Sequence, residues 1–588
     1  MAVRLFLNRV LIGMKSQRPI RLIAMDVFLI GMMALLAGCG LIYEYLLSHY
    51  AARVLGAVES TIYAMIGLMI VSMGMGAFTA RLIKQSHRGF AWLESWIALV
   101  GSAAILLIAA VIGFAEQLPQ LAAETYQLPP DSRLYGLFSW PANFAQYLPF
   151  VAGTFLGWLI GMEIPLIARI REDLYGQHLV HNAGTIYGAD YIGAGLGAAI
   201  WVLLLLKIDI NTAAVLTASV NLLVGIVFLV IYRKKIGRMT GLVILQLALI
   251  ASLGLMWKNG SDWMSAMSDT LFVDKVIYRQ NTPYQQLVVT QRKLGRTAPV
   301  YDLYINGRLQ FSSQDEKIYH SYLVYPAMAA AARTDNVLVI GGGDGLALRN
   351  ILRWDPKQVT LIDLDSEMVE MFSEPKDVSQ SLPSWKQFML DLNQRSFSDQ
   401  RVEKIYGDAF IEIDPLIQTG RKYDVIIVDL PDPSHPNLNK LYSRHFYARL
   451  KQLLNGDGAI TVQSTSPYHA QKAFISIGKT LQASGFAAVD PYHANVPSFG
   501  EWGWHLAVPL GQSGAKRLQR LSSAEPLPVA DDWITSGLVQ GAFQFGKNFL
   551  AGQQAIAINR LGSHVVYQYH FEAWKKDQGL YTQFGKQE

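Results

Sequence analysis

Charged residues are spread very unevenly along this chain, and that unevenness constrains the fold more than any single motif does. From about residue 22 to residue 257 the sequence is a series of long apolar segments, whereas beyond about residue 270 it has the mixed composition of a soluble protein. A helix of about 20 apolar residues crosses a bilayer. We therefore expect a multi-span membrane domain over 1–257, with about seven spans at 23–47, 56–80, 92–114, 146–168, 185–206, 212–232 and 240–257.

Lysine and arginine residues beside these spans predict the orientation. Basic residues gather at 4–21, 81–88 and 233–238, and the alternate loop at 115–142 carries acidic residues. Cytoplasmic loops are enriched in lysine and arginine, so we expect the N-terminus in the cytoplasm. Seven spans would place the soluble part outside the cytoplasm, whereas six or eight would place it inside.

Composition excludes several kinds of site. Cys39 is the only cysteine and lies within the first span, so an intrachain disulfide is impossible and a cysteine metal site is not expected. The net charge of +5 mostly reflects the basic loops, so no nucleic-acid partner is expected. We find no cluster of metal-ligand residues and expect no metal.

The segment 270–332 predicts a small β-hairpin domain and a connecting helix. Asn306-Gly307 is a strong two-residue hairpin signal between alternating apolar and polar residues. A helix is expected at about 314–332, with acidic residues in its first turn as the helix dipole favours. The expected strands include 276–278, 286–289 and 303–305.

The segment 333–510 alternates short apolar runs with helical stretches, which predicts a Rossmann-like, methyltransferase-type doubly wound parallel sheet. The fold class is thus a multi-span α-helical membrane domain followed by α/β. Residues 511–588 are interpreted as a C-terminal extension with ordered packing segments and no assigned chemistry. The expected parallel strands are 337–340, 359–362, 402–406, 425–428 and 460–462.

A glycine turn follows the first of these strands. Gly341 to Gly345 would let the backbone approach a nucleoside, because glycine tolerates positive φ and has no Cβ. Asp344 inside the turn would disfavour a pyrophosphate and favour a ligand with a positive end. Ligands of such sheets bind beyond the carboxyl ends of the strands, so the turn indicates a cationic nucleoside.

Carboxylates follow the later strands as well. Asp363, about 20 residues after the glycine turn, suits the two hydroxyls of a ribose, with a helix N-cap as the alternative. Asp408 could accept from an adenine amino group or belong to a turn. Asp429 and Asp432 are held by two prolines, and their alternative is an Asx turn.

Taken in order, these motifs resemble the polyamine aminopropyltransferases, spermidine synthases above all, over about 275–510. The resemblance implies a transferase that moves an aminopropyl group from decarboxylated S-adenosylmethionine to putrescine, giving spermidine and methylthioadenosine. No prosthetic group is implied. The matching motifs are Tyr284-Gln285, Asn306-Gly307 with Gln310, Asp315-Glu316 with Tyr319-His320, Gly341 to Gly345, Asp363-Leu364-Asp365, Gly407-Asp408-Ala409, Asp429 to Pro433 with Pro436, and Pro497 to Gly500.

The resemblance also implies a role for each matching residue. Asp429 matches the general base. Leu430 and Pro431 depart from the small or polar residues common in the family, and Phe499 stands where a tyrosine is common, so the acceptor amine is left open. The donor would be bound by Gln285, Gly341, Gly343, Asp363, Asp408, Ala409 and Pro436, and the amine by Gln310, Tyr319, His320, Asp344, Asp429 and Asp432.

Two other functions fit parts of the sequence. A methyltransferase shares the sheet but has no need of the stretch from Gln310 to His320, and a membrane transporter or sensor would bind polyamine without catalysis. Glu44, Glu163 and Asp190 lie in or beside spans, where charges are costly and usually functional. They indicate either a polar cavity for a cationic polyamine or a structural polar network.

The expected location is the inner membrane of a bacterial-type cell, in contact with the lipid bilayer. Decarboxylated S-adenosylmethionine is a cytosolic metabolite, so we expect the catalytic domain on the cytosolic side despite the count of seven spans. A homo-oligomer is expected.

Overall fold

The computed structural model describes residues 20–577 apart from 56–57, 127–136, 139, 142–143, 146, 177–179, 270–271, 273, 294, 296, 376–380, 524–526, 528 and 551–552. The chain divides into two compact units, Met1–Val273 and Asp274–Glu588. The basic segment expected at 4–21 and the acidic Asp131 fall almost entirely outside the described residues. The further division of the second unit into three domains stays a prediction.

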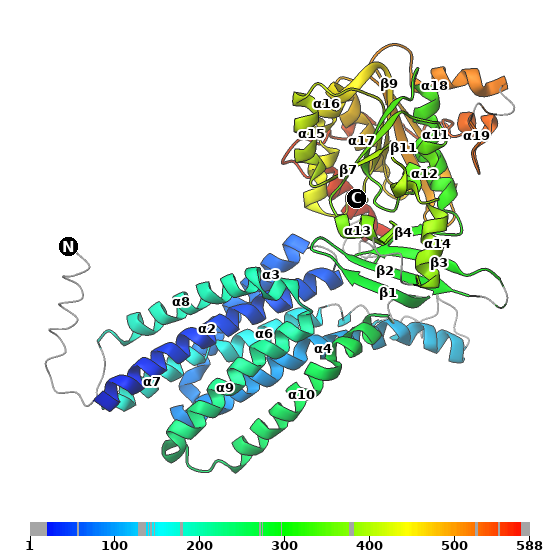
Figure 1. Ribbon diagram of the computed structural model, residues 1–588. Coiled ribbons are helices and arrows are strands. Elements are labelled where there is room, and N and C mark those ends of the chain that lie inside the picture. Colours follow the sequence, from blue (N-terminus) through cyan, green and yellow to red (C-terminus); the bar gives the residue numbers. More distant parts are fainter. Residues whose placement is uncertain are drawn as a thin grey trace, which may run out of the picture. The chain divides into compact units, whose positions relative to one another are not determined.

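The first unit is a bundle of long apolar helices (Figure 1). In the described ranges, seven helical segments are long and apolar enough to cross a membrane, as expected from the sequence. Several helices run beyond the predicted spans, and the fourth span consists of two helices that meet at Gly161-Met162. The helices are α2 (Ile20–Leu55), α3 (Val58–Thr79), α4 (Ser86–Tyr126), α6 (Leu148–Ile160), α7 (Glu163–Tyr175), α8 (Asn182–Leu203), α9 (Ile210–Ile236) and α10 (Thr240–Asp269).

The second unit begins with a four-stranded antiparallel sheet in the order β1-β2-β3-β4. The predicted hairpin is present, because Asn306 and Gly307 adopt φ of 51° and 77° and Ile305 pairs with Arg308. Apolar residues of this sheet share a core with the large sheet that follows. The strands are β1 (Lys275–Asn281), β2 (Gln286–Arg292), β3 (Val300–Ile305) and β4 (Arg308–Ser312).

A seven-stranded sheet follows, in the order β10-β11-β9-β8-β5-β6-β7. The five predicted strands are parallel, and the antiparallel pair β10 and β11, which the sequence did not indicate, extends the sheet beside β9. The strands are β5 (Asn336–Gly341), β6 (Gln358–Asp363), β7 (Val402–Tyr406), β8 (Tyr423–Asp429), β9 (Leu454–Gln463), β10 (Ala488–Val496) and β11 (Gly500–Val508).

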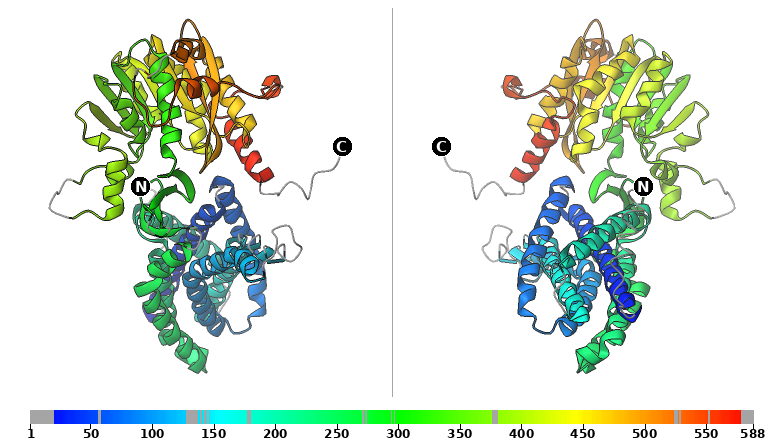
Figure 2. Two further views of the ribbon diagram at one scale, coloured as in Figure 1. Left: turned by 90° about the vertical axis from the view of Figure 1, so that its right-hand side faces the viewer. Right: turned by 90° about the vertical axis from the view of Figure 1, so that its left-hand side faces the viewer.

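Two apolar cores cover the two faces of this sheet. Alternate residues of a strand point to opposite faces, so Val337 and Val339 join one core while Leu338 and Ile340 join the other. The first core contains α11 (Glu316–Ala330), α12 (Leu346–Leu352), α13 (Ser366–Met371) and α14 (Ser384–Leu392), with α18 (Gly514–Leu518) and α19 (Ser536–Gly541) at its edge. The second contains α15 (Ala409–Gln418), α16 (Arg444–Leu453), α17 (Gln471–Ala483) and α20 (Val565–Asp577), and α20 packs on α17 (Figure 2).

Candidate active site

The strand order reverses between β5 and β8, which places two predicted motifs side by side. β6 and β7 follow β5 in one direction, and β8 and β9 lie in the other. Gly341 at the end of β5 pairs directly with Asp429 at the end of β8. Such a switch point opens a crevice at the carboxyl ends of the strands. The glycine turn and the expected base therefore meet at one edge of the sheet.

The glycine turn needs its glycines. Gly341 and Gly342 have φ of 80° and 75°, where side chains are strained. A Cβ on Gly341 would lie 2.0 Å from the carbonyl oxygen of Asp429, and a Cβ on Gly342 would lie 3.4 Å from Asp429 Oδ2. The backbone of the turn is thus in contact with the residue that carries the carboxylate, and no larger residue fits between them.

Asp429 is half-buried and is held by a phenol. The hydroxyl of Tyr319 in α11 donates to Asp429 Oδ1 at 2.8 Å. Burial raises the pKa of Asp429 to about 6, with a further rise from the charge of Asp344, while His320 and the Tyr319 hydrogen bond lower it. At neutral pH this carboxylate is ionised, yet its pKa is close enough to 7 for it to accept a proton.

A chain of buried charges supports Asp344. Arg349 donates to both oxygens of Glu316, at 2.8 and 3.0 Å, and His320 Nδ1 lies 3.0 Å from Glu316 Oε2. The other ring nitrogen of His320 faces Asp344 Oδ2 at 4.0 Å. Burial lowers the pKa of His320, but the hydrogen bond with Glu316 and the charge of Asp344 outweigh it and the pKa is raised. Burial raises the pKa of Asp344.

Asp363 ends β6 beside the glycine turn. A Cβ on Gly343 would lie 2.9 Å from Asp363 Oδ2, and Asp363 Oδ1 accepts from the backbone N–H of Asp365 at 2.8 Å. Burial raises the pKa of Asp363 to about 6. Gln285 reaches the same loop from the antiparallel sheet and donates to Asp365 Oδ2 at 2.8 Å. Asp365 thus links the antiparallel sheet to the loop after β6, and Gln280 makes a second link to Glu367 in α13.

Asp408 is the N-cap of α15 and is also ion-paired. Its side chain accepts from the backbone N–H of Phe410 at 3.0 Å and pairs with Lys440. Ala409 follows as the first residue of α15 and is buried. Pro436 is buried at the start of the 3₁₀ helix Pro436–Tyr442, the element that also carries Lys440.

Asp432 is held by residues far from it in the sequence. Gln463, at the end of β9, donates to Asp432 Oδ1 at 2.8 Å, and His570 Nε2 in α20 lies 3.2 Å from Oδ2. Burial raises the pKa of Asp432, but the hydrogen bond with His570 outweighs it and the pKa is lowered. His570 was missed by the sequence reasoning, and Trp574 Nε1 lies 3.2 Å from the same nitrogen.

The remaining predicted residues lie around this edge. Gln310 lies half-buried in β4. The ring of Phe499 lies edge-on to Tyr319 with centroids 6.0 Å apart, and the adjacent Ser498 donates to Asp315 through its backbone N–H and its hydroxyl. These two hydrogen bonds connect the β10–β11 turn to the start of α11, the helix that carries Tyr319 and His320.

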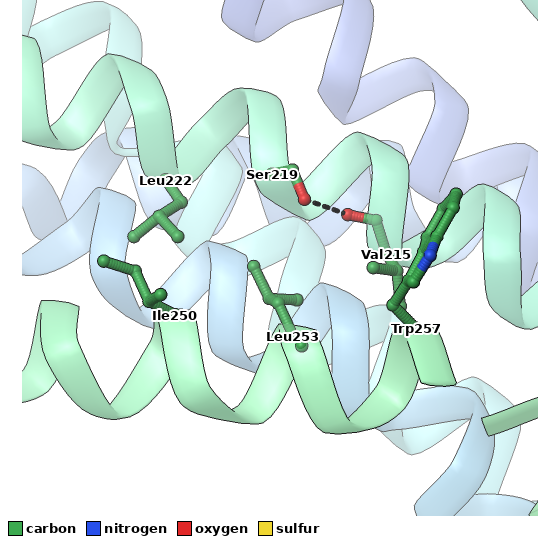
Figure 3. A pocket seen from close by; sticks show the side chains of 7 residues that line it. Val215, Ser219, Leu222, Ile250, Leu253 and Trp257 are labelled. Atoms are coloured by element: carbon green, nitrogen blue, oxygen red, sulfur yellow. Dashed lines mark hydrogen bonds between the residues drawn. The ribbon is translucent and has the colours of Figure 1, made fainter. Parts of the chain in front are cut away.

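Two cavities lie away from this edge. One, of about 270 Å³, lies between α9 and α10, and its Ser219 hydroxyl donates to the carbonyl of Val215, which leaves an apolar lining (Figure 3). The other, of about 310 Å³, lies between β1, α13 and α14 and is lined by Tyr278, Glu367 and Trp385 among others. Neither contains a residue predicted for the chemistry.

Similarity to characterised proteins identifies the family. The polyamine aminopropyltransferase of Shewanella oneidensis is 57% identical over 558 residues, which are 94% of this chain and 96% of that protein. The chain belongs to the polyamine aminopropyltransferase family. Polyamine aminopropyltransferase 1 of Streptomyces coelicolor is 33% identical over 498 residues, 83% of this chain and 84% of that protein.

Two further comparisons concern the synthase part. Residues 316–515 match the spermine/spermidine synthase domain. The crystal structure of spermidine synthase from Thermotoga maritima aligns with a TM-score of 0.39 and 19% identity, over 48% of this chain and 87% of that one. Family membership confirms the predicted enzyme class, a transferase of polyamine biosynthesis.

Proposed function

We propose that this aminopropyltransferase moves the aminopropyl group of decarboxylated S-adenosylmethionine to putrescine, with spermidine and methylthioadenosine as products. The observation that carries the proposal is the pairing of Gly341 with Asp429, because it brings a nucleoside-type turn and a half-buried carboxylate to one sheet edge. The family relationship over nearly the whole chain supports the same reaction.

The donor would lie across the ends of β5, β6 and β7. Its adenosine would take Gly341, Gly343, Asp363, Asp408, Ala409, Pro436 and Gln285 as neighbours. Asp363 accepts from the backbone N–H of Asp365, and its carboxylate oxygens would also accept from the ribose hydroxyls. Asp408 forms an ion pair with Lys440. To accept a hydrogen bond from the adenine amino group, its carboxylate must either give up this ion pair or bind both partners at once.

The amines are cations, and the site carries the matching charge. Asp344 would hold the ammonium at the end of the aminopropyl arm, and its raised pKa indicates that the carboxylate gains from such a partner. Asp432, whose pKa is lowered, stays ionised and would bind the distal ammonium of the acceptor. Gln310, Tyr319 and His320 would complete the wall around the amine.

The transfer step follows from these placements. The attacking amine is protonated in water, because amines of this type have a pKa near about 10. Asp429 removes that proton, and the nitrogen lone pair attacks the methylene beside the sulfonium. The carbon–sulfur bond breaks with its electrons on sulfur, so the sulfonium charge is lost and neutral methylthioadenosine leaves.

The proposal is tested with the purified full chain. Decarboxylated S-adenosylmethionine and putrescine should give spermidine and methylthioadenosine in equal amounts by mass spectrometry, and S-adenosylmethionine itself should give neither. Cadaverine and spermidine, offered in competition, determine the acceptor, which Leu430 and Pro431 beside the base leave open. Methyl transfer from S-adenosylmethionine would instead support the methyltransferase.

We also propose that the seven apolar helices anchor the protein in the inner membrane of a bacterial-type cell, with the catalytic unit in the cytosol, where the donor is made. With seven spans this requires the N-terminus on the opposite side, against the orientation that the basic residues predict. The length and composition of the helices support the anchor. An alkaline phosphatase fused after Glu588 should be inactive, and a green fluorescent protein fused there should fluoresce. The reverse result would place the unit outside. The expected homo-oligomer stays a prediction that light scattering of the purified protein would test.

A further inference from the structure

The core of the helical unit buries two glutamates from different helices. Glu94 in α4 is 0% exposed and Glu163 at the start of α7 is 1% exposed. Glu163 was singled out in the sequence, whereas Glu94 was not. Moving an ionised carboxylate into such surroundings is very costly unless the charge has a partner. The contacts of these two residues therefore decide what the core can bind.

Each glutamate has one oxygen without a hydrogen-bond partner among the described residues. Asn221 in α9 donates to Glu94 Oε2 at 3.1 Å, but Glu94 Oε1 and Glu163 Oε2 are buried and unpartnered. The same holds for the side-chain oxygens of Asn221 and Gln246, although the Gln246 amide donates to Ser95 at 2.9 Å. These four unpaired oxygens are acceptors, so they would bind a cation placed among them.

The two glutamates lie on helices that pack against each other, α4 and α7. The carboxyl group of Glu163 interacts electrostatically with those of Glu94 and Asp190. The buried hydroxyl of Tyr43 in α2 and the thiol of Cys39 interact electrostatically with both glutamates. Tyr43 also has no hydrogen-bond partner in the described part of the chain. Within the same ranges, no lysine, arginine or histidine forms an ion pair with Glu94 or Glu163.

The junction beside Glu163 is tightly enclosed. α6 ends at Ile160 and α7 begins at Glu163, and Gly161-Met162 between them keep right-handed helical φ and ψ inside one apolar span. A Cβ on Gly161 would lie 2.0 Å from the carbonyl oxygen of Met73, so α3 packs directly against this junction.

We propose that Glu94 and Glu163 form a binding site for a small monovalent cation in the core of the helical unit. The cation would be accepted by the unpaired oxygens of the two glutamates, with those of Asn221 and Gln246 close by. Sodium and the ammonium head of a primary amine share the required compact positive charge. The site is separate from the transfer reaction, and its test does not depend on that reaction.

Binding of radioactive sodium and of labelled methylammonium tests the site, with the full chain in lipid nanodiscs and equilibrium dialysis. The double variant E94Q/E163Q should bind the preferred cation about tenfold more weakly or worse, equivalent to at least about 1.4 kcal/mol. D262N removes an exposed carboxylate of the same unit and should bind as the wild type does. Binding of methylammonium at the transfer site is common to all three proteins and cancels.

The identity of the preferred probe distinguishes sodium from an ammonium group. Tetramethylammonium, which has the charge without N–H donors or a small radius, should not compete. Equal binding of both probes by the wild type and E94Q/E163Q would overturn the proposal, because the pair would then hold only protons or serve the packing. An unchanged thermal-unfolding transition of the helical unit in nanodiscs shows that the double variant is folded.

A second measurement uses the wild type alone. Dicyclohexylcarbodiimide modifies carboxyl groups in apolar surroundings, and peptide mapping locates the products. Labelling at Glu94 or Glu163 should fall about tenfold when the preferred cation is added at well above its Kd. If neither cation changes the extent of labelling at any concentration, the proposed site is contradicted. This result does not depend on whether the variants fold.

Discussion

The strand-end site and the core of the helical unit both contain carboxylates that are partly or fully buried, and they surround them differently. At the strand ends Glu316 has Arg349 and His320, Asp429 has Tyr319, and Asp432 has Gln463 and His570. In the helical core Glu94 and Glu163 each keep an unpaired oxygen. A buried carboxylate with partners is fixed in position, whereas one without them is available to a ligand.

This contrast separates carboxylates that are held in position by hydrogen bonds from carboxylates whose oxygens are available to a cation. Removing one partner of a buried ion pair leaves an uncompensated charge and is strongly destabilising, while neutralising an unpaired carboxylate removes an existing cost. The catalytic unit should therefore respond to substitution of its carboxylates through stability and rate, and the helical unit through ligand binding.

The largest effect is expected at Asp429. Asp429→Asn removes the base and should lower kcat by about 10² to 10⁴-fold, measured as methylthioadenosine release at pH 7.5. Because the amide is isosteric and still accepts from Tyr319, donor affinity should change little. Asp391→Asn, at an exposed position of α14, is the matched control. A rate within twofold of the wild type would show that another group takes the proton.

A pair of isosteric variants, one in each unit, tests this contrast directly. Glu316→Gln should lower the free energy of unfolding of the catalytic unit by about 3–5 kcal/mol, whereas Glu94→Gln should leave the helical unit unchanged or more stable. Thermal unfolding in nanodiscs, followed by hydrogen exchange of each unit, measures both. Equal losses in the two variants would mean that Glu94 is as well partnered as Glu316.

Glu316 also predicts a pH dependence. Burial raises its pKa, but hydrogen bonds from His320 and Arg349 outweigh this and hold the pKa at about 2, below the usual value of about 4.3. A lowered pKa stabilises the fold above the unfolded value, and the stabilisation is lost as pH falls from about 4.3 to about 2. Glu316→Gln should remove that part of the acid-unfolding curve.

A smaller effect is expected at His570. His570→Ala removes a hydrogen bond to a charged group, worth about 1.5–3 kcal/mol, so kcat/KM for the amine should fall roughly 10- to 100-fold, mainly through KM. His570→Gln, which can still donate to Asp432, should recover part of the loss. Glu572→Ala, an exposed position on the same helix, is the control. An unchanged KM for the amine in His570→Ala would mean that α20 does not contribute to amine binding.

The smallest effect is a shift in the pH profile. Activity needs ionised Asp429, so kcat/KM should fall as pH drops through its pKa of about 6. The Tyr319 hydrogen bond lowers that pKa, and Tyr319→Phe should raise it by about one unit, given about 1.36 kcal/mol per unit. The acidic limb of the profile then moves to higher pH. A limb that stays in place would assign the titration to a different group.

The parts of the site that are local in sequence were predictable. The alternation and length of each apolar run locate the ends of β5, β6, β7 and β8, and Asp363 and Asp429 lie at those ends. The turn at Asn306-Gly307 was predicted for the same reason, because positive φ at both residues leaves few alternatives.

The parts that depend on distant contacts were not predictable. His570 lies 138 positions from Asp432 and has no motif of its own. The strand β10 contains Pro491, which argues against a strand unless it lies at a sheet edge, as β10 does. Glu94 could have been found by counting charges within the third span, since burial of a carboxylate there needs a reason.

The contact between α20 and Asp432 has a consequence for protein synthesis. Chains emerge from the ribosome N-terminus first, and domains fold in that order. The sheet, the glycine turn and Asp429 are all made before residue 570, so a growing chain can assemble the donor side of the site while the wall beside Asp432 is still missing. An mRNA truncated before the codon for His570 should therefore yield a protein that binds the nucleoside of the donor but binds the amine poorly. Such a protein would compete for the donor without catalysing the transfer.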